Sequence, residues 1–127
     1  MIGRVLVVDD DDNVRRSLEA SLARGRFEVV TAKTGEHAIE LADQNFDIVI
    51  SDYNMNTALS GADVVSHYKQ QFGDRVFCVV LSGEDDDATR TKCFDAGADA
   101  VLMKPILPSE LRRRLGSAVM ALRSLAA

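Results

Sequence analysis

Short runs of branched apolar residues alternate with segments of helical periodicity along the whole chain, and this alternation leaves few possible folds. The apolar runs predict five strands, at residues 5–8, 27–31, 47–52, 76–81 and 98–103. Strands that alternate with helices form a parallel sheet joined by right-handed crossovers. The sequence therefore predicts a doubly wound α/β domain, (βα)5, with a five-stranded parallel sheet.

Several helical segments have recognisable starts, stops or buried faces. Asp11 or Asp12 is expected to cap the first helix, and Ala42 to lie on the buried side of the second. Gly97 tolerates positive φ and is expected to end the fourth helix, while Pro108 fits the first turn of the fifth. No repeat or linker interrupts the pattern, so residues 1–127 are predicted to form one domain.

Composition narrows the class of function. The formal net charge of −5 disfavours direct binding of nucleic acid, because its phosphates attract a basic surface. No apolar run is long enough to span a bilayer and no signal-peptide pattern is present, so a cytoplasmic location away from the membrane is expected. Cys78 and Cys93 lack metal-ligand spacing and are expected to be reduced thiols.

Polar residues of a particular kind follow the predicted strands. Asp9 and Asp10 follow the first strand, Asp52 ends the third, Ser82 follows the fourth and Lys104 follows the fifth. If the strands take the doubly wound order 2-1-3-4-5, these four strands are neighbours, and their carboxyl ends converge at the switch point of the sheet. Taken singly, each residue is more simply a cap, a turn residue or a solvated charge; together they predict a site.

The chemistry of that set points to phosphoryl transfer. Three carboxylates close together need a positive partner, and Mg²⁺ (or Mn²⁺) prefers oxygen ligands of this kind. Lys104 adds a fixed positive charge and Ser82 a hydroxyl donor, which together suit the charged oxygens of a phosphoryl group. A carboxylate in such a site can act as the nucleophile and form an aspartyl-phosphate.

The residues at 5–10, 47–52, 81–83, 97–99 and 104–105 resemble the receiver domain of two-component response regulators, and the resemblance covers essentially the whole chain. It implies a flavodoxin-like fold with strand order 2-1-3-4-5. It also implies that Asp52 is the phosphoacceptor. Asp10 would be the principal Mg²⁺ carboxylate, Asp9 would act largely through metal-bound water, and the backbone carbonyl of Asn54 would be a further ligand.

The resemblance assigns roles around the phosphoryl group as well. Ser82 would donate to one phosphoryl oxygen and Lys104 would pair with another. The peptide bond between Lys104 and Pro105 would be cis, as in many such domains. Asn54 and Glu84, each two residues beyond a site residue, would tune loss of the phosphoryl group, and this pair of residue types implies a fairly short-lived phosphate.

The sequence departs from the family pattern at three places. Asn56 stands where receivers usually have proline, in a loop about one residue longer than typical. Val101 replaces the usual Tyr, Phe or His of the fifth strand, so the inward swing of that aromatic cannot operate in its usual form. Ile106 stands where Phe is common, which is interpreted as a tolerated core change.

The resulting hypothesis is a phosphorylation-controlled switch and not a turnover enzyme. A histidine kinase or histidine phosphotransfer protein would donate to Asp52, and an unidentified output domain or protein would bind the altered surface. The chain would be a monomer or a dimer formed on phosphorylation, and either a complete regulator or the N-terminal part of a longer protein. The alternatives are a flavodoxin-like redox carrier, a Mg²⁺-dependent aspartyl phosphatase and a receiver that binds partners without phosphorylation.

Overall fold

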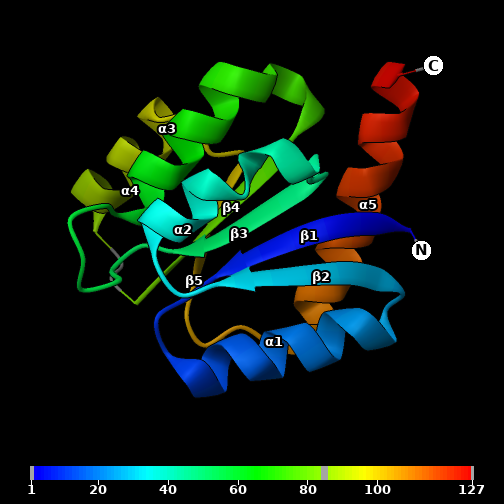
Figure 1. The fold of residues 1–127 in the computed structure, drawn as a ribbon, viewed down its shortest axis with the longest axis horizontal. Helices are drawn as coiled ribbons and strands as arrows, with labels where there is room; N and C mark the ends of the chain where they lie inside the picture. The colour runs from blue at the N-terminus through cyan, green and yellow to red at the C-terminus, as the bar shows by residue number, and fades with distance from the viewer. Residues whose placement is uncertain (1, 84–85, 127) are drawn as a thin grey trace.

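The computed structural model describes residues 2–83 and 86–126. Their strands and helices alternate as predicted, and Figure 1 shows them as three layers, with helices on both faces of a central sheet. The elements run β1 Gly3–Val8, α1 Asp12–Arg24, β2 Phe27–Ala32, α2 Gly35–Glu40, β3 Ile48–Asp52, α3 Gly61–Phe72, β4 Phe77–Ser82, α4 Asp87–Asp95, β5 Ala100–Met103 and α5 Pro108–Ala126, with short 3₁₀ turns at Ala42–Gln44 and Gly73–Arg75.

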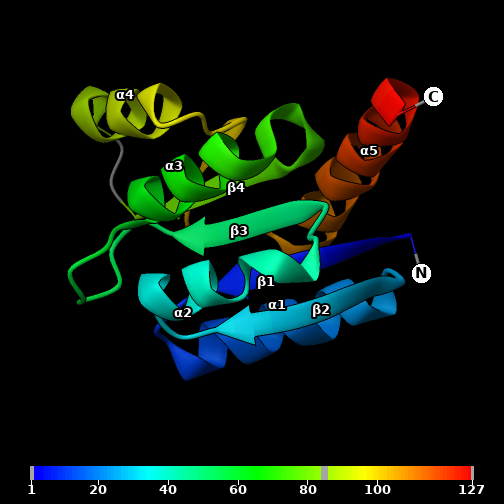
Figure 2. The same ribbon diagram turned by 45° about the horizontal axis from the view of Figure 1, so that its top comes forward.

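The sheet is parallel throughout and its strand order is β2-β1-β3-β4-β5, which confirms the predicted topology. α1 and α5 cover one face, while α2, α3 and α4 cover the other (Figures 1 and 2). Because successive strand residues point to opposite faces, the sheet divides its side chains between two cores. Within the described ranges, no helix combines the length and apolar character that a membrane span needs.

Both cores are built from the predicted apolar runs. On the α1/α5 side, strand residues pack against helix residues such as Leu22, Leu111 and Leu115, each at most 1% exposed. On the other side Tyr68 is fully buried, and its hydroxyl donates to the carbonyl of Ala38 at 2.6 Å. Burial raises the pKa of the Tyr68 hydroxyl, so this donor keeps its proton.

Every predicted strand range differs from the observed one by one or two residues at one or both ends, and the differences around α2 and at the start of β5 have a local cause. α2 ends at Glu40 with Leu41 as its C-cap, and Ala42 is buried in a separate 3₁₀ turn that ends where Asn45 takes a left-handed conformation (φ 59°). The fifth strand begins at Ala100 and not at residue 98. The positive φ of Gly97 (108°) turns the chain after α4, and the Asp99 side chain accepts the backbone N–H of Cys78 (2.8 Å).

Candidate functional site

The site lies where β1, β3, β4 and β5 end. The sheet register pairs Asp52 with Leu81 and Ser82 with Met103, so the strands finish at nearly the same level. Asp9 immediately follows β1, and Lys104 immediately follows β5, with its N–H bonded to the carbonyl of Ser82 at 2.8 Å. The predicted strand-end residues therefore share one edge of the sheet.

Three carboxylates form the acidic cluster of Asp9, Asp10 and Asp52. One oxygen of each lies within 4.8 Å of the others. Asp9 is only 1% exposed and Asp52 9% exposed, whereas Asp10 is half-buried. Three converging carboxylate oxygens, open to water on one side, fit a hard divalent cation such as Mg²⁺, which keeps several waters and takes few protein ligands.

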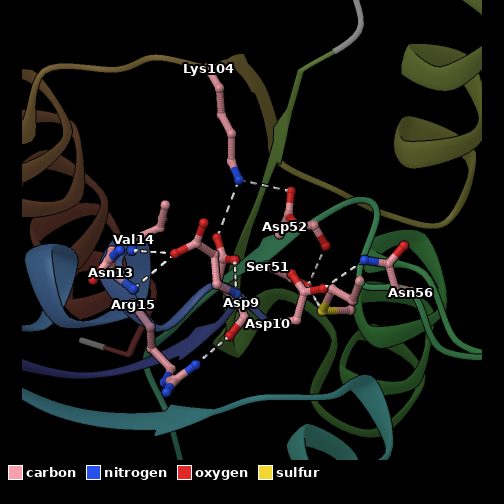
Figure 3. A network of polar contacts seen from close by, with 11 residues as sticks. Asp9, Asp10, Asn13, Val14, Arg15, Ser51, Asp52, Asn56 and Lys104 are labelled. Carbon is pink, nitrogen blue, oxygen red and sulfur yellow. Dashed lines mark hydrogen bonds and ion pairs between the residues drawn. The ribbon is translucent and has the colours of Figure 1, made fainter.

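Lys104 reaches into this cluster from 95 residues away in the sequence. Its Nζ lies 3.2 Å from Asp9 Oδ2 and 3.1 Å from Asp52 Oδ1 (Figure 3). Burial alone lowers the pKa of Lys104, but its contacts with Asp52 and Asp9 outweigh burial and raise it. The ammonium is therefore a fixed positive charge beside Asp52. The peptide bond between Lys104 and Pro105 is cis, as the resemblance implied.

Asp52 titrates abnormally because of where it lies. Burial raises the pKa of its carboxyl group; the hydrogen bond from Lys104 lowers the pKa, and the charges of Asp9 and Asp10 raise it again, with a net upward shift. The ionised form of Asp52 is thus destabilised by burial and by the neighbouring negative charges. A further positive charge in the acidic cluster would offset that destabilisation.

The turn after β1 is braced by contacts that hold Asp9 and Asp10 in place. Asp11 caps α1 by accepting the backbone N–H groups of Asn13 and Val14, which confirms one of the two predicted caps. Arg15 is buried, and its Nη1 donates to the backbone carbonyl of Asp9 at 2.9 Å. Nothing in the sequence pattern singled out Arg15, because it reads as one more charge on the polar face of a helix.

The loop after β3 carries two asparagines close to the cluster. Asn54 is exposed and lies two residues beyond Asp52. The Asn56 side chain reaches back to Asp10, and its Nδ2 lies 3.2 Å from Asp10 Oδ2. The sequence identified Asn56 only as a departure from the family pattern, not as a contact of an acidic residue.

Gly61 lets α3 begin directly against the phosphoacceptor candidate. A Cβ added at this position would lie 2.6 Å from the carbonyl oxygen of Asp52. The Gly61 N–H also bonds to the carbonyl of Tyr53 at 2.9 Å. The backbone at Asp52 and Tyr53 is therefore packed directly against the start of α3.

A family model for the response regulator receiver domain matches residues 5–116. The chain belongs to the response regulator receiver family. Among curated relatives of this receiver, the transcriptional regulatory protein PrrA of Mycobacterium bovis is 41% identical over 113 residues, which are 88% of this chain and 48% of PrrA. The cyclic di-GMP phosphodiesterase of Thermotoga maritima is 35% identical over 115 residues, 91% of this chain and 30% of that protein.

The receiver thus spans about half or less of the length of these two relatives. Among solved structures, the chemotaxis protein CheY4 of Vibrio cholerae matches with a TM-score of 0.85 at 28% identity, over 93% of this chain and 99% of that one. The match confirms the flavodoxin-like fold implied by the sequence resemblance.

The remaining residues singled out from the sequence lie around this edge or outside the described ranges. Ser82 is 2% exposed at the end of β4, and Val101 is 7% exposed in the neighbouring β5. Val101 packs in the core on the α2/α3/α4 side of the sheet, and its carbonyl lies 3.5 Å from Arg90 Nη1. Glu84 lies outside the residues that the structure describes.

Proposed function

We propose that this receiver is a phosphorylation-controlled switch whose phosphoacceptor is Asp52. The observation that carries the proposal is the contact of one ammonium, Lys104, with both Asp52 and Asp9 at 3.1–3.2 Å, inside a cluster of three carboxylates. One lysine among three acids leaves room for a divalent cation, and cation plus ammonium suit the charge of a phosphoryl group.

Each residue of the site has a distinct role in the proposed phosphoryl transfer. An Asp52 carboxylate oxygen attacks phosphorus, forming an O–P bond while the P–N bond to a donor histidine breaks and its electron pair stays on the imidazole. Lys104 moves from Asp52 to a phosphoryl oxygen, and the Ser82 hydroxyl donates to another. Mg²⁺ (or Mn²⁺), held by Asp9, Asp10, Asp52 and the carbonyl of Asn54, would supply charge neutralisation.

The switch hypothesis also covers partners and lifetime. The donor is a histidine kinase or a histidine phosphotransfer protein, and the chain catalyses only its own phosphorylation and dephosphorylation. Asn54 and Glu84 give the phosphate a short lifetime; persistence of the phosphorylated protein for many hours would contradict this assignment. Val101 leaves the β4/β5 surface without the usual aromatic, so the conformational response there is smaller or different.

The output is proposed from the relatives. PrrA is named a transcriptional regulator and the Thermotoga protein a phosphodiesterase, although both extend well beyond the matched region. We infer that this receiver controls an output domain or partner protein in the cytoplasm and does not itself bind nucleic acid or membrane. Its oligomeric state follows phosphorylation, as a monomer or as a dimer formed on activation.

The decisive test is phosphorylation by a small donor. The protein is incubated with MgCl₂ and phosphoramidate, and its intact mass is measured over time. A single added phosphoryl group is expected, absent in Asp52→Asn and when EDTA replaces MgCl₂. Asp43→Asn, which removes an exposed acid in the turn after α2, is the matched control and should be phosphorylated normally. No addition to the unaltered protein would support a receiver that works without phosphorylation.

A further inference from the structure

The loop that follows β3 holds one member of the acidic cluster. Asn56 Nδ2 donates to Asp10 Oδ2 at 3.2 Å, although the two residues are 46 positions apart. Figure 3 shows the Asn56 amide directed at the Asp10 carboxylate from the side opposite Asp9. This hydrogen bond ties the β1–α1 turn, which supplies Asp9 and Asp10, to the loop that carries the Asn54 carbonyl.

Among the described residues, this contact falls on the one carboxylate of the cluster that forms no ion pair with a cationic side chain. Lys104 lies within ion-pair distance of Asp9 and Asp52, and in the described part of the chain Asp10 has its side-chain contact with Asn56 instead. An amide donor orients a carboxylate without cancelling its charge. The Asn56 amide therefore gives the Asp10 carboxylate a defined direction, which a metal ligand requires.

The backbone around Asn56 makes this orientation possible. Met55 is 2% exposed, and its sulfur lies 3.9 Å from the Ser51 hydroxyl, so the residue before Asn56 is anchored in the core. Asn56 itself has φ 52°, a left-handed conformation that asparagine adopts more readily than most residues. Proline, the usual family residue at this position, is fixed near −65° and has no side-chain donor.

We propose that Asn56 is a positioning residue of the metal site, which raises the affinity for a divalent cation by holding the Asp10 carboxylate in its ligating orientation. The inference rests on the proposed function, because it concerns the same metal site. Groups that hydrogen-bond to metal ligands commonly change affinity by about 10–100-fold when removed. Asn56 is exposed, so the effect lies at or below the lower end of that range.

The test is a titration of metal-free protein with MgCl₂, followed by backbone amide NMR shifts of residues 9–13. Asn56→Gly removes the donor while keeping the left-handed backbone accessible. It is expected to weaken Mg²⁺ binding by about 5–10-fold. Thr57→Ala is the matched control in the same exposed loop, and should leave the affinity unchanged. The melting temperature in EDTA should be the same for all three proteins.

A second measurement separates the contact from a general loosening of the loop. In an Asp10→Ala background, where no carboxylate remains to be positioned, Asn56→Gly should not weaken residual cation binding further, as measured by Mn²⁺ line broadening. A further loss there would overturn the inference in favour of loop flexibility. Unchanged or tighter Mg²⁺ binding by Asn56→Gly would also overturn it, since tighter binding means that the amide competes with the metal.

The outcome distinguishes this inference from the function on which it rests. If the unaltered protein binds Mg²⁺ and is phosphorylated, and Asn56→Gly binds Mg²⁺ with the same affinity, only the proposed role of Asn56 is wrong. If the unaltered protein shows no Mg²⁺ binding in the titration, the metal site and the proposed switch fail together.

Discussion

Two lysine–aspartate contacts lie at opposite ends of the sheet, and they differ in the balance of charge. Near the start of β4, Lys69 Nζ lies 2.7 Å from Asp99 Oδ2 and donates to the carbonyl of Val76, while Asp99 also accepts the N–H of Cys78. One cation meets one anion there. At the other end, Lys104 contacts two carboxylates, Asp9 and Asp52, and a third, Asp10, belongs to the same cluster. The charge-balanced Lys69–Asp99 pair stabilises the fold, whereas the excess negative charge around Lys104 favours binding of a cation.

The largest effect that separates the two lysines should be on phosphorylation. Lys104→Met removes a donor aimed at the transferred group and should slow phosphorylation by about 100-fold or more. Lys69 contacts the residues that precede β4 and β5, at the end of the sheet away from the site, so Lys69→Met should leave the phosphorylation rate unchanged within error. Time courses of intact mass with phosphoramidate and MgCl₂ measure both rates. Equal slowing by the two substitutions would mean that Lys104 acts only through the fold.

The second effect concerns the free energy of unfolding. The Lys69 side chain is 14% exposed, and its removal leaves Asp99 without a cation although the Cys78 N–H still donates to it. Lys69→Met should therefore cost about 2 kcal/mol, less than breaking a fully buried pair. Lys33→Met is the control, because its side chain is 67% exposed and lies 3.6 Å from Asp12. It should change stability by less than about 0.5 kcal/mol in urea unfolding. Similar losses for both would contradict the structural role of Lys69.

The same comparison shows what the sequence could and could not predict. The fold was predictable because apolar runs and helical periodicity alternate without a break, and the strand-end residues followed once the strand order was assumed. The start of β5 was not, because it depends on the Asp99 side chain bonding to Cys78. Asn56 was missed as a contact of Asp10 for a similar reason, since a loop with φ 52° cannot be read from residue types.

The contribution of Arg15 was hidden in another way. A buried guanidinium that donates to the carbonyl of Asp9 looks, in sequence, like any other charged residue of an amphipathic helix. Its burial follows from how α1 lies against the turn after β1. Residue types at strand ends are therefore visible before the structure, but the contacts that orient them depend on tertiary packing.

The smallest expected effect is on the melting temperature. It distinguishes the two sites most clearly, because substitution of Asp52 and of Asp99 should shift the melting temperature in opposite directions. Asp52→Asn in EDTA should raise the melting temperature by a few degrees. Burial and its acidic neighbours raise the pKa of Asp52, so the folded protein holds that proton more tightly than the unfolded chain does, and ionised Asp52 costs stability. Asp99→Asn removes the partner of Lys69 and should lower the melting temperature.

The pH and metal dependence complete this last test. The advantage of Asp52→Asn is present where Asp52 is ionised. It should shrink as the pH falls to and below the ordinary aspartate pKa of 3.8, because protonated Asp52 is as neutral as asparagine. Added Mg²⁺ binds only the folded protein and should stabilise the unaltered chain more than Asp52→Asn, because the substitution removes a ligand. Melting curves at several pH values, with EDTA or MgCl₂, measure both trends. If Asp52→Asn and Asp99→Asn were equally destabilising in EDTA, the acidic cluster would be as balanced as the Lys69 pair, and the case for a cation there would fail.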